Sequence, residues 1–435
     1  MGADTQTIDG LLKDDYEDFV AESVLNKNPL KDLFRFEDKG FTGREVIYSD
    51  HVSANSGSMF TNEDGAFAEA GNQGHVQVRI GQKKLMGRIR MTYESMKDSM
   101  SSEGAFKQAR RDEMEGLIKD LAYKDEVSLS GDGRGVLALV DEASPTGDTT
   151  LELDAPGGIT GDDFGNRFVS SGIWVGAVNP ATGALRASSV VKVTAANEDG
   201  TDVTLSTTMS NTAENDYLVQ AANSAVTDVL DTSYENGFWG LTALVDDGTY
   251  RDNYFGVSRT TYPAKKSYVK AATGALSIDL LQQVSDIVDQ KLGGSIDLLV
   301  CHHSIRRLII QLTEADRRYS GANLMKPDPG TVAFKQGDLT MGEVPIKAIR
   351  TAPLGMLFLL DKANTGWVSY TSEKGKWVDE DGSILVRVGT GTTGRDAFEG
   401  WYRIRKQNHA RYPGYNARLD GITGQSLVVV RAAGR

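Results

Sequence analysis

The sequence predicts a mixed α+β protein with several domains, and three features indicate this class. The first is a long amphipathic helix between Ser101 and Gly131 that leads into the apolar segment Val136–Val140. The second is a series of strand-like segments inside an acidic stretch, 141–236. The third is a helical pattern at 277–291 followed by the strand-like Asp297–Cys301, which with neighbouring strands makes an α/β unit.

The long helix is predicted from the spacing of its apolar residues. At 100° per residue they fall within roughly 120° of arc. They are Phe106, Met114, Leu117, Ile118 and Leu121. Ser101 or Ser102 can cap the start, and Gly131 can adopt the left-handed conformation that ends a helix. Gly116 in the interior costs about 1 kcal/mol, so tertiary packing must hold that turn.

Composition limits the class of protein. A chain of 435 residues can bury a sizeable core and suggests two or three domains. Its one cysteine, Cys301, excludes a disulfide framework within the chain and fits a reducing compartment. No apolar run reaches membrane-spanning length, and no signal-peptide pattern is present. We therefore expect a soluble protein, made inside the cell, with no membrane partner.

The net charge of −13 is concentrated in one stretch. Between Asp141 and Glu235 there are 15 acidic and 3 basic residues, a net of −12, so the rest of the chain is close to −1. An acidic stretch is usually a solvated surface, and this one argues against contact with nucleic acid. It contains five strand candidates, and we expect a small β-barrel or sandwich inserted at 141–236, with its ends close together. The candidates are TTLEL, GIWVGAV, SSVVKVTAA, DVTLSTT and DYLVQAA.

The first 90 residues predict an arm and then a long hairpin. In the arm, 1–40, a helix follows Thr7 and ends at Asn28-Pro29. Residues 41–91 contain two segments of strand composition, separated by a Gly-, Ser-, Asn- and Ala-rich stretch that cannot form a core of its own. Because a lone two-stranded hairpin is marginal in water, it needs a surface to lie on. That surface is either a neighbouring subunit or the body of the same chain.

Charge is polarised along this predicted hairpin. Acidic residues from Asp50 onward lie toward the tip, and basic residues lie on the returning strand. This polarity suits head-to-neighbour packing between identical subunits. The residues expected at such an inter-subunit contact are Glu63, Asp64, Glu69, Arg79, Lys83, Lys84, Arg88 and Arg90.

No motif predicts catalysis. Gly389–Gly394 matches GxGxxG, but a strand-like segment follows it, whereas a dinucleotide site needs a helix there. Cys301-His302-His303 lacks a complete metal-ligand spacing, and His51, His75 and His409 are isolated in sequence. No GxSxG elbow occurs. We therefore expect no catalytic residue, no cofactor and no metal.

The order of the parts resembles the major capsid proteins of tailed bacteriophages, which have the HK97-like fold. Strings spread over most of the chain outside 141–236 carry the resemblance. They are SSEGAFKQARRDEMEGLIKDLAYKDEVSLSGDGRGVLALV, FWGLTALVDD, YFGVSRTTYP, IDLLVCHHSIRRLIIQLTEADRRY and GRDAFEGWYRIRKQNHARYPGYNARLDGI. None of these strings is a catalytic motif, so the resemblance depends on all of them together and not on a single signature.

The resemblance implies a domain for each stretch of the chain. The expected parts are an N-terminal arm (1–40), an extended β-hairpin loop (41–91), a peripheral domain with the long spine helix (92–140), the inserted β domain (141–236), an axial α/β domain (237–365) and the C-terminal strands of the peripheral domain (366–435). Thr313–Asp338 is the expected loop at five- and six-fold centres. Some relatives cross-link through a lysine on the extended loop, but residues 45–82 contain no lysine, so we expect no covalent cross-links.

The resemblance also implies a function. The chain would assemble with itself into hexamers and pentamers of an icosahedral phage head that encloses double-stranded DNA without sequence-specific binding. It would assemble in the host cytoplasm and remain in the virion. Expected partners are a separate scaffolding protein, because the chain starts at the short arm, a portal protein, and a decoration protein on 141–236, which we expect on the outer surface. The alternatives are an encapsulin-like nanocompartment shell, an α/β enzyme with a β accessory domain, or a monomeric adhesion or tail-decoration module.

Overall fold

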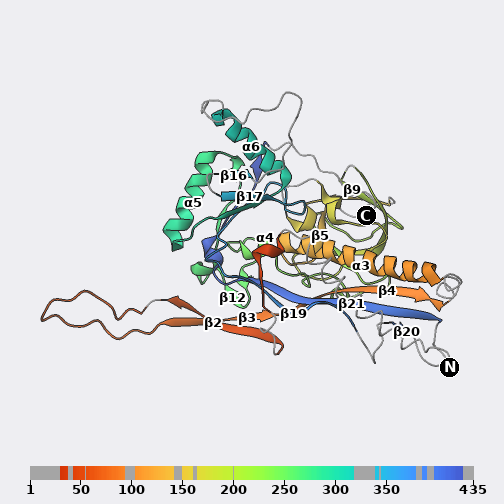
Figure 1. Cartoon of the computed structure of the whole chain (residues 1–435), viewed down its shortest axis with the longest axis horizontal. Coiled ribbons are helices and arrows are strands. Elements are labelled where there is room, and N and C mark those ends of the chain that lie inside the picture. The colour runs from red at the N-terminus through yellow and green to blue at the C-terminus, as the bar shows by residue number, and fades with distance from the viewer. Residues whose placement is uncertain are drawn as a thin grey trace.

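A computed structural model describes most of the chain as a body with one long projection (Figure 1). The described residues are 30–37, 43–53, 55–93, 103–141, 149–159, 164–198, 200–317, 339–341, 344–378, 385–388 and 396–424. Five sequence-based expectations concern other residues: the arm helix, the serine cap of the long helix, the GxGxxG segment, the last part of the predicted C-terminal strands (425–435) and the part of the predicted axial loop after Arg317. These lie outside the described residues.

A five-stranded sheet runs along the base of the body, with β4 pairing on the central strand β21. Its strands are β1 (Arg35–Glu37), β19 (Trp367–Trp377), β21 (Ala397–Ala410), β20 (Val386–Arg387) and β4 (Lys83–Thr92). β21 confirms that the segment after the GxGxxG match is a strand and not the helix that a dinucleotide site requires.

One strand of this sheet passes through a glycine without ending. β19 is continuous from Trp367 to Trp377. Gly375 has a φ of 127°, and the register with β21 shifts between Glu373 and Lys376. The strand therefore continues through a local irregularity instead of ending at the glycine.

The predicted long helix is confirmed as α3 (Glu103–Ser130), and it packs on β4. Met114, Ile118 and Leu121 are buried together with Ile89 and Tyr402 of the sheet. The expected left-handed end at Gly131 is wrong. The left-handed residues are Gly133 and Gly135, with φ of 78° and 73°. The turn into β5 (Val136–Val140) therefore uses the later glycines of the segment.

The acidic stretch forms a closed six-stranded barrel in the order β10-β5-β6-β9-β8-β7. The strands other than β5 match the five candidates, and they are β6 (Thr150–Asp154), β7 (Trp174–Val178), β8 (Val191–Ala196), β9 (Asp202–Leu205) and β10 (Tyr217–Ala221). β5, which we had placed with the long helix, is also a barrel strand, so the barrel starts before residue 141. Alternating Val, Leu and Ala side chains fill its interior.

A mixed six-stranded sheet forms the other half of the body, in the order β13-β22-β18-β15-β17-β16. Its strands are β13 (Tyr268–Lys270), β22 (Ala417–Leu419), β18 (Leu357–Leu360), β15 (Leu298–Cys301), β17 (Val344–Ala348) and β16 (Leu339–Met341). α5 (Ile278–Leu292), which matches the helical pattern predicted at 277–291 and is capped by Ser277, and α6 (His303–Arg317) belong to this half. Although β22 follows the C-terminal strands in sequence, it pairs here with β18.

Short elements complete the fold. They are α4 (Leu241–Leu244), the pair β11 (Asn253–Tyr254) and β12 (Val257–Ser258), and the pair β14 (Gly274–Ala275) and β23 (Ile422–Thr423). The projection is the hairpin of β2 (Glu45–Ser53) and β3 (Gly74–Gly81). Among the described helices, none is both long and apolar enough to cross a membrane.

Two glycines, one in α3 and one beside it, should respond oppositely to alanine. A Cβ at Gly116 would meet no atom within 4 Å, so Gly116→Ala should raise the free energy of unfolding by about 0.5–1 kcal/mol through helix propensity. A Cβ at Gly240 would lie 2.3 Å from the carbonyl oxygen of Ser128, so Gly240→Ala should destabilise by about 1–3 kcal/mol. Denaturant unfolding of both variants checks this. Equal changes in the free energy of unfolding would contradict the open space at Gly116 and the close contact at Gly240.

Candidate assembly surface

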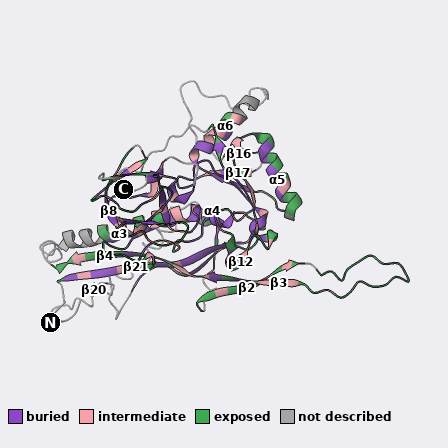
Figure 2. Ribbon diagram, turned by 180° about the vertical axis from the view of Figure 1, so that it is seen from behind, coloured by how far each residue is buried: buried purple, intermediate pink, exposed green. Residues whose placement is uncertain are grey.

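The hairpin extends far from the body and ends in an exposed loop. β2 and β3 pair antiparallel from Glu45–Gly81 to His51–His75, and the register shifts before Ser53. Beyond this ladder, residues 55–73 continue outward as two adjacent segments without strand pairing (Figures 1 and 2). Nearly all of these loop residues are exposed. The loop therefore presents its side chains to solvent or to another molecule.

The base of the hairpin, in contrast, packs on its own chain. Val78 and Ile80 of β3 are fully buried against Val257 and Tyr370, and the Arg79 amide donates to the Phe255 carbonyl at 2.9 Å. Residues on the other face, such as Ile47, which is 53% exposed, point to solvent. The period-2 alternation thus makes a hairpin with one attached face. Of the two surfaces that the sequence left open, the body of the same chain holds the base of the hairpin, whereas the outer part projects from the body.

Polar contacts fix the attached face. Asp50 of β2 forms an ion pair with Lys265, whose ammonium also donates to the Arg411 carbonyl at 2.9 Å. Both groups are largely buried, at 13% and 2% side-chain exposure. The Tyr48 hydroxyl lies 2.7 Å from Nε2 of the buried His409. Asp50, which the sequence placed with the acidic tip, therefore belongs to the root of the hairpin.

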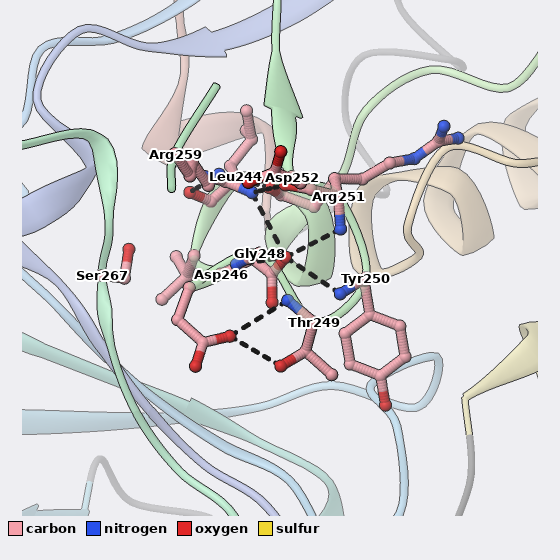
Figure 3. A network of polar contacts seen from close by, with 12 residues as sticks. Leu244, Asp246, Gly248, Thr249, Tyr250, Arg251, Asp252, Arg259 and Ser267 are labelled. Atoms are coloured by element: carbon pink, nitrogen blue, oxygen red, sulfur yellow. Dashed lines mark hydrogen bonds and ion pairs between the residues drawn. The ribbon is translucent and has the colours of Figure 1, made fainter. Parts of the chain in front are cut away.

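Lys265 connects this root to a buried charge network centred on Asp246. Figure 3 shows Asp246 with Gly248, Tyr250, Arg251 and Arg259. The Asp246 carboxylate accepts amide hydrogen bonds from Gly248, Tyr250 and Arg251 at 2.8–3.2 Å. It also pairs with Arg259 and Arg418 at 3.3 and 3.1 Å, and all three side chains are fully buried. Arg259 Nε donates to the Lys265 carbonyl at 3.1 Å, and Arg418 lies on β22. One network thus joins the hairpin root to the six-stranded sheet.

The structure divides the predicted contact residues into two groups. Glu63, Asp64 and Glu69 are exposed on the loop, and Arg79 is exposed on β3, where it donates to Gln77 at 3.3 Å. The four remaining residues are not on the hairpin, because the returning strand divides at Gln82 and β4 joins the body sheet. This corrects the predicted hairpin at 41–91.

The second group lies on the body. Arg88 and Arg90 pair with Glu399 of β21, and the Lys83 ammonium donates to the Glu235 carbonyl at 2.7 Å. Lys84 is exposed on β4. The sequence pattern could not separate β3 from β4, because both strands alternate and one uncharged residue divides them.

Sequence reasoning missed three apolar residues on the loop. Met59, Phe60 and Phe67 are 58%, 104% and 88% exposed. We had judged the stretch by its abundance of small and polar residues. The two phenylalanines in an otherwise polar stretch were the signal that could have indicated a contact surface. Large apolar side chains that cluster in contact with water mark such surfaces.

Two kinds of reactive site can be checked in the described part of the chain, a metal-ligand cluster and a thiol–imidazole pair. The described part contains no group of three or more His, Cys, Asp and Glu residues that could hold a metal ion. Burial raises the pKa of the Cys301 thiol to about 12, and burial with nearby arginines lowers the pKa of His302 to about 3. A thiol and an imidazole that both stay neutral near pH 7 do not form an activated nucleophile pair.

The fold is that of phage capsid proteins. No protein-family model and no curated protein sequence matches the chain. The capsid asymmetric unit of cyanophage A-1(L) aligns over 91% of this chain and 93% of that chain, with a TM-score of 0.56 and 9% identity. A native GTA particle capsid and Mycobacterium phage Bobi align over 91% and 92% of this chain and 90% and 91% of theirs, at 9% and 8% identity, with lower TM-scores of 0.44 and 0.42. The alignment with the cyanophage capsid confirms the resemblance to phage capsid proteins at the level of the fold.

Acid should destabilise the hairpin root through His409. Burial, together with the charges of Lys265 and Arg411, lowers the pKa of this histidine well below 6.5. Below about pH 6.5 the unfolded chain therefore binds a proton that the folded chain does not, and stability falls by up to about 1.4 kcal/mol per pH unit for this group. Denaturant unfolding at pH 7.5 and 5.5 should show a smaller loss for His409→Gln than for the native chain.

Tyr48→Phe is the matched control. It removes the hydroxyl that contacts the ring but keeps the buried histidine, so it should retain the native pH dependence even if it lowers stability at both pH values. If His409→Gln lost as much stability between pH 7.5 and 5.5 as the native chain does, His409 would not be the group responsible for the acid sensitivity.

Proposed function

We propose that this chain is the major capsid protein of a tailed phage, a structural protein without catalytic activity that assembles with itself into an icosahedral head. The observation that carries the proposal is the hairpin: its root is fixed to the body by buried charges, while its outer loop exposes Met59, Phe60 and Phe67 to solvent. An isolated chain gains nothing from exposing these side chains. In a shell, a neighbouring subunit would cover them.

The contact is head-to-tail rather than symmetric. The outer loop of one chain meets a different surface of the next, so the contact repeats around a ring and closes where the rotation allows. We propose hexamers and pentamers as these rings. The attached root sets the direction of the loop, and the exposed apolar side chains supply most of the contact energy, because burying a phenylalanine contributes about 1.5–3 kcal/mol. Glu63, Asp64, Glu69 and Arg79 would lie at the rim of this contact.

The barrel is proposed to face outward and to contact a decoration protein. Its stretch of the sequence carries nearly all of the net negative charge, and a surface of this sign would be repelled by packaged DNA. The proposal includes enclosure of double-stranded DNA without sequence-specific contacts, assembly in the host cytoplasm, and a scaffolding and a portal protein as partners. The family resemblance supports these last points.

Removing the loop phenylalanines should prevent assembly without unfolding the chain. Phe60→Ser combined with Phe67→Ser should greatly reduce particle yield in sedimentation and electron microscopy, because both side chains are exposed in the single chain and their loss weakens each contact by about 3 kcal/mol or more. Leu230→Ser is the control and should assemble normally. Leu230 follows the last barrel strand in sequence, and its side chain is 79% exposed. Normal particles from the double variant would exclude the loop contact.

The same particles distinguish a phage head from a nanocompartment. Nuclease-resistant DNA in particles isolated from phage-producing cells supports the proposal, whereas particles that hold only a protein cargo favour the encapsulin-like alternative.

Particles should contain no covalent links between chains. The loop and both hairpin strands lack lysine from Glu45 to Gln82, so no amine is available there for an isopeptide bond. Boiled particles should give one band at the mass of the single chain on a denaturing gel. A ladder of higher bands would show that a lysine elsewhere, such as Lys83 or Lys84, forms cross-links.

A further inference from the structure

The hairpin places two histidines opposite each other near the end of its ladder. His51 on β2 and His75 on β3 are direct cross-strand partners, and their ring centroids lie 5.4 Å apart with the planes tilted by 60°. Both side chains are exposed. In sequence the two residues lie far apart and seemed unrelated, and the register of the hairpin brings them together.

We propose that His51 and His75 form a binding site for one divalent transition-metal ion, with Zn²⁺ as the best fit. A zinc–imidazole bond is about 2.0–2.1 Å long and the geometry is tetrahedral, so two rings that bind one ion have centroids about 5 Å apart. The observed separation is close to this value. Because both side chains are exposed, rotation about their own bonds can bring one nitrogen of each ring to the ion.

The surroundings of the pair favour a cation. On the same face, the adjacent pair is Ser49 and Gln77, which are uncharged and offer oxygen atoms. The nearest basic residue along β3 on this face is Arg79, which lies two pairs farther toward the base, opposite Ile47. The Arg79 guanidinium donates to the Gln77 side-chain oxygen at 3.3 Å, but within the described hairpin strands no basic residue stands in the pair beside the two histidines.

A second histidine pair shows the contrast. His302 and His303 have ring centroids 5.6 Å apart, but His302 is buried, and the charges of Arg167 and Arg307 act on both rings. These positive charges oppose a bound cation, so ring separation by itself does not make a site. The exposed pair on the hairpin has a suitable ring separation, and no basic residue stands in the pair beside it.

The ion would join the two strands where their pairing ends. The register shift between His51 and Ser53 marks this point, and the loop 55–73 follows. Two imidazoles leave the other coordination positions to water or to a group from another molecule. An ion that binds the paired strands stabilises them by mass action, so zinc should fix the point from which the loop leaves the hairpin.

Calorimetric titration of the full-length, unassembled chain with zinc chloride at pH 7.5 tests the site. We expect one ion per chain, and magnesium chloride should give no binding, because Mg²⁺ prefers oxygen ligands. His51→Gln and His75→Gln should each weaken zinc binding at least tenfold, since either leaves a single imidazole. His303→Gln should leave the affinity unchanged.

Lowering the pH gives a second readout. Zinc binding should weaken as the pH is lowered, because protons compete with the ion for the imidazole nitrogens. Zinc binding that persists in the double variant His51→Gln/His75→Gln would overturn the proposal, as would the absence of zinc binding to the native chain. Circular dichroism of these surface variants confirms that they remain folded.

Discussion

The buried carboxylate of Asp246 holds together parts of the chain that are remote in sequence. Removing a carboxylate from water costs several kcal/mol, and that cost is offset only when charges and hydrogen bonds surround it. Here three backbone amides and two arginines do so. Arg259 and Arg418 in turn donate to main-chain carbonyls of 242–245, so the arginines are also satisfied. Replacing one member would leave the others charged and buried, and the network is therefore fixed as a unit.

The direction of the hairpin depends on this network. Lys265 accepts from Arg259 through its carbonyl and pairs with Asp50 through its ammonium, so the first strand of the hairpin is tied to the same unit. The apolar face of β3 adds a second attachment at Val78 and Ile80. A long projection whose root has both apolar and charged attachments can present its outer loop in a defined direction, although the loop itself has little internal packing.

Much of the fold could be predicted because its elements have strong local patterns. The apolar stripe of α3, the helical pattern of α5 and the strand candidates of the barrel each depend on residues close in sequence, and each was confirmed. The division of the returning strand at Gln82 could not be predicted, because it depends on which partner each half finds. β3 pairs with β2 and β4 pairs with β21, more than 300 residues later.

The candidate site was predicted less completely for the same reason. Exposed charges at Glu63, Asp64 and Glu69 followed from composition, and they do lie on the loop. The roles of Asp50 and Arg88 depend on long-range partners, Lys265 and Glu399, that no local pattern indicates. The exposure of Phe60 and Phe67 contradicts the usual expectation that aromatic residues are buried.

The barrel joins the rest of the molecule at a single point where the chain enters and leaves it. The chain enters the barrel at Gly135 and leaves it at Ser233, and the Ser233 hydroxyl donates to the Gly135 carbonyl at 2.7 Å. Gly135 has φ of 73°, and a Cβ there would lie 2.0 Å from the Ser233 carbonyl oxygen. Entry and exit are therefore adjacent, and the rest of the fold accommodates the barrel through one narrow junction and a few side-chain contacts such as Arg167 to the Ala352 carbonyl. A module joined in this way can be enlarged, exchanged or given a different charge while the sheets and the hairpin keep their sequence, so the barrel and the rest of the fold can evolve separately.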